Sequence, residues 1–183
     1  AIYYKTQKSH QYGYLYNKDI TTKEEASKNF QDLFGVSFTE SRYFKKYVAN
    51  NPIIDNRIIL GGNRLFFIEP LEATSITANI EWASYIYDWI LLKRNNAVLT
   101  VKKIKEFILQ LESFILWHYQ FGSKYDTPFW DYAKTLTIED PNFYKMLDFT
   151  LSVGDEWFSS ENNNIQYGQW RPFNFHYWHE GVS

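Results

Sequence analysis

Residues 101–115 read VKKIKEFILQLESFI and have the clearest helical pattern of the chain. The apolar residues of this stretch recur every three or four positions, at Val101, Ile104, Ile108, Leu111 and Ile115. This spacing places them on one face of an α-helix, and the charged Lys102, Lys103 and Glu106 lie off that face. We therefore predict an amphipathic helix over residues 100–120, ended by Gly122.

A second long helix is expected directly upstream, before the turn signal Asn95-Asn96. Pro70 suits the first turn of a helix, so this helix should begin near residue 70 and run to about Leu92. Its apolar residues also recur at helical spacing and mark one apolar face as far as about Leu92: Ile76, Ile80, Ala83, Tyr87 and Ile90. Helices 70–92 and 100–121 are then predicted to form the main packed pair.

The rest of the chain suggests shorter elements around this pair. Tyrosines alternate around Gly13, which is typical of one or two strands within residues 3–16. A capping-box spacing starts a helix at 22–34, and residues 36–48 hold one short strand. Residues 57–60 read as a buried strand ended by Gly61-Gly62.

Downstream, the sequence predicts helix starts at Pro128 and near Thr137, the second helix ending near Phe149. Residues 152–170 look like a loop, and residues 172–180 form a last short helix or a strand. The fold class is therefore α+β and mainly α-helical. We expect a single domain or fragment over 1–183, with strands and one helix in 1–65 and mainly helices in 66–183.

Composition limits the classes of function. The chain has 183 residues, and its 19 Lys and Arg nearly balance its 21 Asp and Glu, which argues against a nucleic-acid partner. It has no cysteine, which excludes disulfides and thiolate metal sites and fits a reducing compartment, so we expect a cytoplasmic location. No apolar run approaches the ~20 residues of a membrane helix, and no membrane partner is expected.

Residues 61–76 carry the chemistry and run from a strand through a glycine turn to a helix N-terminus. Backbone N–H groups at such a terminus favour an anion, and Thr74 and Ser75 are placed to present them. Glu72 beside them is a candidate acid or base, or an anchor for a cationic ligand group. The alternative is a capped helix with a solvated glutamate.

Residues 69–76 read EPLEATSI, which resembles the E-P-L-E-(S/A)-T-(S/G)-I motif of the flavin-dependent tryptophan halogenases. Three further segments resemble elements of that family in the same order: Gly13–Tyr16, Glu24–Ala26 and Asp126–Trp130. The resemblance extends from about Gly13 to Trp130 and continues more weakly to the end of the chain.

The resemblance implies an enzyme that uses reduced FAD, oxygen and chloride or bromide to make hypohalous acid, which then halogenates an aromatic, usually indole-like, ring. Thr74 and Ser75 would hold the halide through backbone N–H groups. Ile76 would lie near the flavin ring, and Glu72 between the flavin and substrate pockets. The implied partners are an aromatic small-molecule substrate and a flavin reductase.

The chain also departs from the family. It lacks the glycine-rich dinucleotide turn, and no lysine here can be assigned to the family's catalytic role. Phe66 stands where the family usually has glycine, and Ala73 stands where it usually has serine. We therefore expect a C-terminal part of a halogenase-like flavoprotein, inactive alone, whose partner is the missing N-terminal FAD domain. Sheet edges or apolar surface should be exposed where that part docks.

Two other clusters are weaker signals. His176 and His179 precede Glu180 at helical spacing, but without a third ligand a structural or surface role is favoured, and no metal site is expected. Aromatic residues between Trp157 and Trp178 either fill the core or form a wall for a planar substrate. Two alternatives for the whole chain stay open: a stand-alone, non-catalytic module that binds an aromatic ligand, and a flavin monooxygenase relative that does not halogenate.

Overall fold

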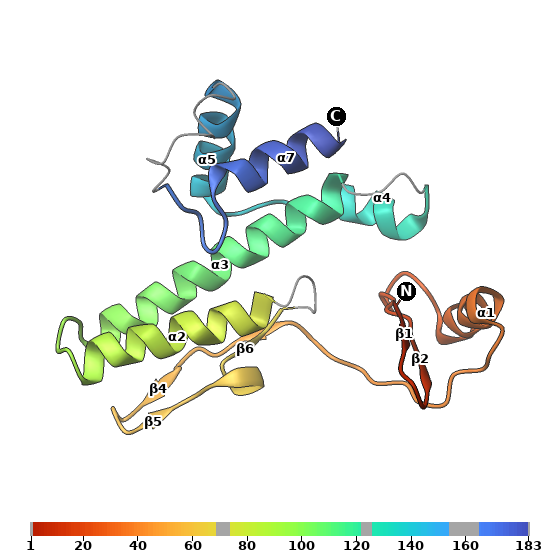
Figure 1. Cartoon of the computed structure of the whole chain (residues 1–183), viewed down its shortest axis with the longest axis horizontal. Coiled ribbons are helices and arrows are strands. Elements are labelled where there is room, and N and C mark those ends of the chain that lie inside the picture. The colour runs from red at the N-terminus through yellow and green to blue at the C-terminus, as the bar shows by residue number, and fades with distance from the viewer. Residues whose placement is uncertain (1, 69–73, 122–125, 154–164, 183) are drawn as a thin grey trace. The chain divides into compact units, whose positions relative to one another are not determined.

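The computed structural model describes residues 2–68, 74–121, 126–153 and 165–182 (Figure 1). The chain separates into two compact units, Ala1–Phe44 with Lys124–Ala133, and Lys45–Ser123 with Lys134–Ser183. The predicted mainly helical α+β class is confirmed, since long helices are accompanied by short two-stranded sheets.

The first unit contains a hairpin and a capped helix. Strands β1 (Ile2–Lys5) and β2 (His10–Gly13) pair antiparallel, with Tyr3 opposite Tyr12. Helix α1 (Lys23–Phe34) begins at the predicted capping box, in which Thr22 and Glu25 bond each other's backbone, and it ends at Gly35 with φ +69°. Helix α4 (Pro128–Thr135) begins at the predicted proline.

The strands of the second unit are very short. Strand β3 (Tyr47–Val48) pairs with β6 (Phe66–Phe67), and β4 (Ile53–Ile54) pairs with β5 (Ile58–Ile59), both antiparallel. The 3₁₀ helix η1 (Gly62–Arg64) lies between β5 and β6. The expected buried strand at 57–60 is therefore only partly right.

The error at residues 57–60 comes from the alternation of side chains in a hairpin. Ile53 pairs with Ile59, and both pack against the core, whereas Ile54 pairs with Ile58 on the other face. Ile58 is 57% exposed, because no second layer covers that face in the described part of the unit.

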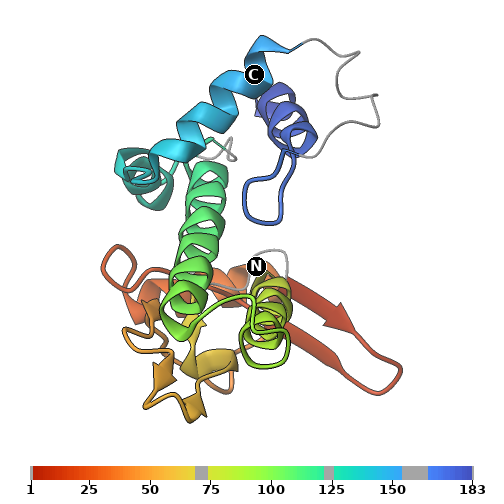
Figure 2. The same cartoon turned by 90° about the vertical axis from the view of Figure 1, so that its left-hand side faces the viewer.

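The predicted pair of long helices is confirmed. Helices α2 (Thr74–Ile90) and α3 (Ala97–Phe121) pack together, and both views show α2 beside the N-terminal half of α3 (Figures 1 and 2). On α3 the predicted face is also right, since Ile104, Ile108, Leu111 and Ile115 are buried. The predicted start of α2 near residue 70 lies outside the described residues.

The apolar face that the sequence marks on α2 is not the face buried in this chain. Ile76 and Ile80 are each 63% exposed, and the buried side chains are Thr74, Ala78 and Trp82. Ala78 is small enough to let α3 approach, and the ring nitrogen of Trp82 donates a hydrogen bond to the Leu60 carbonyl at 2.7 Å. The helix is apolar on two faces, so periodicity alone could not select the one that packs inside this chain.

Helices α5 (Pro141–Ser152) and α7 (Pro172–Val182) pack together near the C-terminal end of α3 (Figure 1). Helix α5 begins slightly later than expected, because Asp140 is its N-cap and accepts from the Asn142 N–H at 3.0 Å. Residues 172–180, for which the sequence allowed a helix or a strand, belong to helix α7. Within the described ranges, no helix is long and apolar enough to cross a membrane.

Candidate active site

The first turn of α2 carries three of the four residues that the sequence singled out. Thr74 faces inward and is only 1% exposed, whereas Ser75 and Ile76 are exposed. The fourth residue, Glu72, lies outside the described residues. The structure therefore gives the geometry of the predicted halide-binding and flavin-contacting positions, and the catalytic role of Glu72 stays a prediction.

The side chain of Asn79 links the first turn of α2 to the glycine turn at Gly62. The Gly62 N–H donates to Asn79 Oδ1 at 2.9 Å, and Asn79 Nδ2 donates to the Ser75 carbonyl at 2.7 Å. Gly62 has φ +54°, a conformation that favours glycine. Sequence reasoning missed Asn79, although its position four residues after Ser75 on a helix was a usable signal.

The Thr74 hydroxyl is the unusual polar atom here. Its Oγ1 is buried and has no hydrogen-bond partner among the residues that the structure describes. A buried hydroxyl without a partner costs about 1–3 kcal/mol, so such atoms usually face water, an ion or a ligand. Thr74 therefore offers a donor at the same helix end that the sequence predicted to bind an anion.

A cavity of about 400 Å³ adjoins this end of α2. One wall is Thr77, which follows Thr74 by three residues and so lies in the next position on that side of the helix. The opposite wall comes from the segment that leads into α7 and includes Gln169, Trp170, Arg171, Phe173 and Asn174. The cavity thus combines two aromatic rings with a cation and amides.

Two residues of this region have buried polar atoms without a hydrogen-bond partner among the described residues. In the described part of the chain, Gln169 Oε1 is buried without a partner, and so is Trp178 Nε1. Trp178 lines a second hollow of about 250 Å³, which shares Trp170 and Asn174 with the first. The two adjoining hollows are thus each lined by a residue with a buried polar atom that lacks a partner in the described part of the chain.

The aromatic cluster predicted between Trp157 and Trp178 fills the core in part, and its role as a wall for a planar substrate stays a prediction. Tyr167, Trp170 and Phe175 are buried in the core, where Trp170 stacks on Phe114 with ring centroids 4.1 Å apart. Trp178 stacks on His118 at 3.8 Å and lines the second hollow. Trp157 lies outside the described residues.

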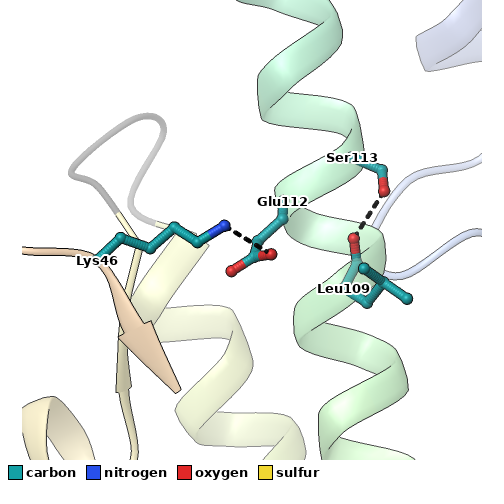
Figure 3. Close-up of polar contacts among 4 residues, drawn as sticks. All are labelled: Lys46, Leu109, Glu112 and Ser113. Carbon is teal, nitrogen blue, oxygen red and sulfur yellow. Dashed lines mark hydrogen bonds and ion pairs between the residues drawn. The ribbon is translucent and has the colours of Figure 1, made fainter. Parts of the chain in front are cut away.

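The charged groups of α3 are engaged in structural contacts. Lys46 Nζ lies 3.1 Å from Glu112 Oε2, an ion pair that joins the start of β3 to α3 (Figure 3). The next residue, Ser113, points away and donates to the Leu109 carbonyl at 2.8 Å. One oxygen of the Glu112 carboxylate is thus paired with a cation, whereas its Oε1 is buried without a hydrogen-bond partner among the described residues.

The histidines of α7 also have a local contact. His176 Nε2 lies 3.3 Å from Glu180 Oε1, one helical turn away. Among the described residues, no three His, Cys, Asp or Glu side chains are grouped so that they could hold a metal ion. Tyr85 of α2 has a raised pKa of about 12. The main cause is burial, and the nearby Glu81 and Glu106 add to it.

A comparison with known proteins identifies a family whose sequence model matches this chain. The model of the tryptophan halogenase family matches residues 5–179. The chain is 26% identical over 183 residues to tryptophan 7-halogenase RebH of Lentzea aerocolonigenes, covering 91% of this chain and 32% of RebH. It is 29% identical over 140 residues to tryptophan 6-halogenase ThaL of Streptomyces albogriseolus, covering 70% of this chain and 25% of ThaL. The chain therefore spans about a third or less of the length of these relatives.

Proposed function

The chain belongs to the tryptophan halogenase family, and on this basis we propose that it supplies the halide- and substrate-binding part of an FAD-dependent halogenase. The observation that carries the proposal is Thr74, whose buried hydroxyl lacks a partner in the described structure. It sits in the first turn of a helix, beside a cavity with aromatic walls. The reaction would combine reduced FAD, oxygen and chloride or bromide with an aromatic, indole-like substrate.

The halide would lie at the N-terminal end of α2. Backbone N–H groups and the helix dipole both favour an anion there. Thr74 and Ser75 would supply N–H donors, and the Thr74 hydroxyl would add a third donor from the buried side. Asn79 would keep this turn in place by holding the Ser75 carbonyl and Gly62 together.

The flavin would contact this chain at Ile76. When bound, reduced FAD would supply two electrons to oxygen, and the oxygen reduced to the peroxide level would oxidise the halide to hypohalous acid. The exposed apolar side chain of Ile76 fits a contact with a flat ring. Because the sequence has no glycine-rich phosphate turn, the rest of the cofactor would be held by the part of a halogenase that this chain does not span, and a flavin reductase would reduce it.

The substrate would occupy the hollows beside Thr77. Trp170 and Phe173 would stack on or flank an aromatic ring, while Gln169 and Arg171 would fix its polar substituents. Glu72, two residues before Thr74, would orient the oxidant or balance charge as the ring is attacked. This arrangement would place the halide and the substrate at one end of α2.

A halogenation assay on a chimera tests the proposal. The segment of RebH that matches this chain is replaced by residues 5–179, and FAD binding is first verified by absorbance. The chimera then receives NADH, a flavin reductase, oxygen, tryptophan or indole, and either bromide or no halide. We expect a brominated product that requires bromide and FAD.

The two alternatives give different results in the same assay. A hydroxylated product without halide incorporation would support the flavin monooxygenase. If the FAD-bound chimera yields no oxidised product at all, while the isolated chain binds an indole without flavin, the aromatic-binding module is supported. The aromatic side chains that line the two hollows are the observation that supports the aromatic-binding module as a second candidate.

A further inference from the structure

Helix α2 carries an exposed apolar face that we call the α2 stripe, made of Ile76, Ile80, Ala83, Tyr87 and Ile90. Ile76 and Ile80 are 63% exposed, Tyr87 is 51% exposed, and Ala83 and Ile90 are also exposed. None of the five belongs to the core cluster of buried residues or to the partly buried side chains packed against it. Within the described part of its own unit, the stripe is therefore apolar surface that no other side chain covers.

The spacing of the stripe is that of a helix-packing seam. Its members follow one another by four, three, four and three residues, which keeps them in one row along the helix. The row is about 21 Å long, because a helix rises about 1.5 Å per residue. The nearby acidic residues lie off the row, and Asp88 is 3.6 Å from Arg94.

The exposed apolar surface continues beyond the helix. Leu91, directly after the stripe, is strongly exposed, and so is Val98 at the start of α3. A row of this length with no charged member exceeds the scattered apolar residues that are normal on a protein surface. Together these features indicate a face shaped to be covered by another helix.

We propose that the α2 stripe is the docking surface for an apolar helix from the part of a tryptophan halogenase that this chain does not span. This inference rests on the proposed function. The chain covers only 32% of the length of RebH, so most of such a protein lies outside it. The stripe also begins at Ile76, two residues after Thr74, and thus at the helix end assigned to the halide and flavin.

The position of Ile76 also favours this occupant over a second copy of the chain. A second copy packed along the whole stripe would cover Ile76, and would close the end of α2 that a flavin-binding part must reach. A helix from that part can cover Ile80 to Ile90 and leave Ile76 to the flavin that the same part holds. The same contact would then deliver the cofactor and bury the stripe.

Thiol labelling tests this proposal, because the chain has no cysteine of its own. Ile80→Cys places a thiol on the stripe, and Lys102→Cys places a control on the exposed side of α3. Each variant is made in the 183-residue chain and in the RebH chimera that binds FAD. The rate of reaction with a water-soluble maleimide is followed by mass spectrometry of the peptide that carries the new cysteine.

We expect Cys at position 80 to react roughly tenfold or more slowly in the chimera than in the isolated chain, with position 102 unchanged. Equal rates at position 80 would overturn the proposal. Protection in the isolated chain that grows with its own concentration would also overturn it, in favour of a second copy. Protection of the isolated chain by phospholipid vesicles would overturn it in favour of a lipid surface.

Two safeguards keep the result decisive. If the chimera does not bind FAD, the remainder of RebH is added to the isolated chain as a separate polypeptide, and a lack of protection there counts against the proposal. Labelling requires neither halide nor turnover. Protection without a halogenated product would therefore uphold the docking surface and contradict the proposed function.

Discussion

Asn79 Oδ1 lies 2.9 Å from the backbone nitrogen of Gly62 and accepts its hydrogen bond, while Asn79 Nδ2 reaches the Ser75 carbonyl at 2.7 Å. One side chain thus joins the glycine turn to the first turn of α2. The turn that would hold the halide is therefore positioned by a residue outside the family-like motif. This relationship makes Asn79 a positioning residue with separable effects on stability and on halide use.

Asn79→Ala should remove both hydrogen bonds and leave the Gly62 N–H without its partner. We expect the free energy of unfolding to fall by about 1–3 kcal/mol, measured by urea denaturation. In the chimera, the KM for bromide should rise while the KM for the aromatic substrate stays within about twofold. Ser84→Ala, an exposed change on the same helix, is the control and should alter neither quantity.

Thr74→Val should separate folding from halide use. Because the Thr74 hydroxyl is buried without a partner in the described structure, its removal should leave the free energy of unfolding of the isolated chain unchanged or raise it by up to about 1 kcal/mol. In the chimera, the same change should raise the KM for bromide. A large loss of stability would instead mean that the hydroxyl has a structural partner.

Ser75→Pro removes a backbone N–H in the first turn of a helix, where proline is otherwise tolerated. Loss of a hydrogen bond to an anion is worth about 1.5–3 kcal/mol, so the KM for bromide should rise roughly ten- to hundredfold in the chimera. Ser75→Ala keeps the N–H and should behave like the parent. Equal KM values for the two variants would exclude this N–H from halide binding.

Tyr85 should make the stability of the folded chain depend on pH in the alkaline range. Burial, followed by Glu81 and Glu106, raises its pKa to about 12 in the folded chain, against about 10 when unfolded. The folded state therefore holds the phenol proton more tightly. This contribution to stability is complete below about pH 10 and is lost as pH rises toward about 12.

Tyr85→Phe tests whether the ionisation of Tyr85 causes this loss of stability at high pH. Urea unfolding at pH 9 and pH 11 should show a smaller loss of stability for the variant than for the parent. Tyr132→Phe, which changes an exposed tyrosine of α4, is the control and should follow the parent. An identical loss in all three proteins would remove Tyr85 from the explanation.

The sequence predicted those elements whose signals are local. The capping box of α1, the proline at the start of α4 and the core face of α3 each depend on residues within one or two turns, and all three are confirmed. The hairpin β4–β5 was half predicted. Its turn places Asp55 and Asn56 at positive φ, and alternation along the two strands puts Ile53 and Ile59 on the covered face and Ile54 and Ile58 on the other.

The orientation of α2 could not be predicted, because it depends on contacts distant in the sequence. Trp82 reaches the Leu60 carbonyl, and Asn79 reaches Gly62, and together they turn the more regular isoleucine row away from the core. The same contacts explain why the candidate site was only partly foreseen. Motif spacing indicated Thr74 and Ser75, whereas Thr77, Gln169 and Arg171 meet only through folding.

The most direct measurement of the central claim is the mass spectrum of the product formed by the FAD-bound chimera with tryptophan or indole in bromide. We expect a monobrominated product with the paired isotope peaks of bromine, absent without bromide and strongly reduced by Ser75→Pro but not by Ser75→Ala. A folded chimera that binds FAD and consumes NADH, yet leaves the ring free of bromine, would contradict the claim that this chain forms the halide and substrate site.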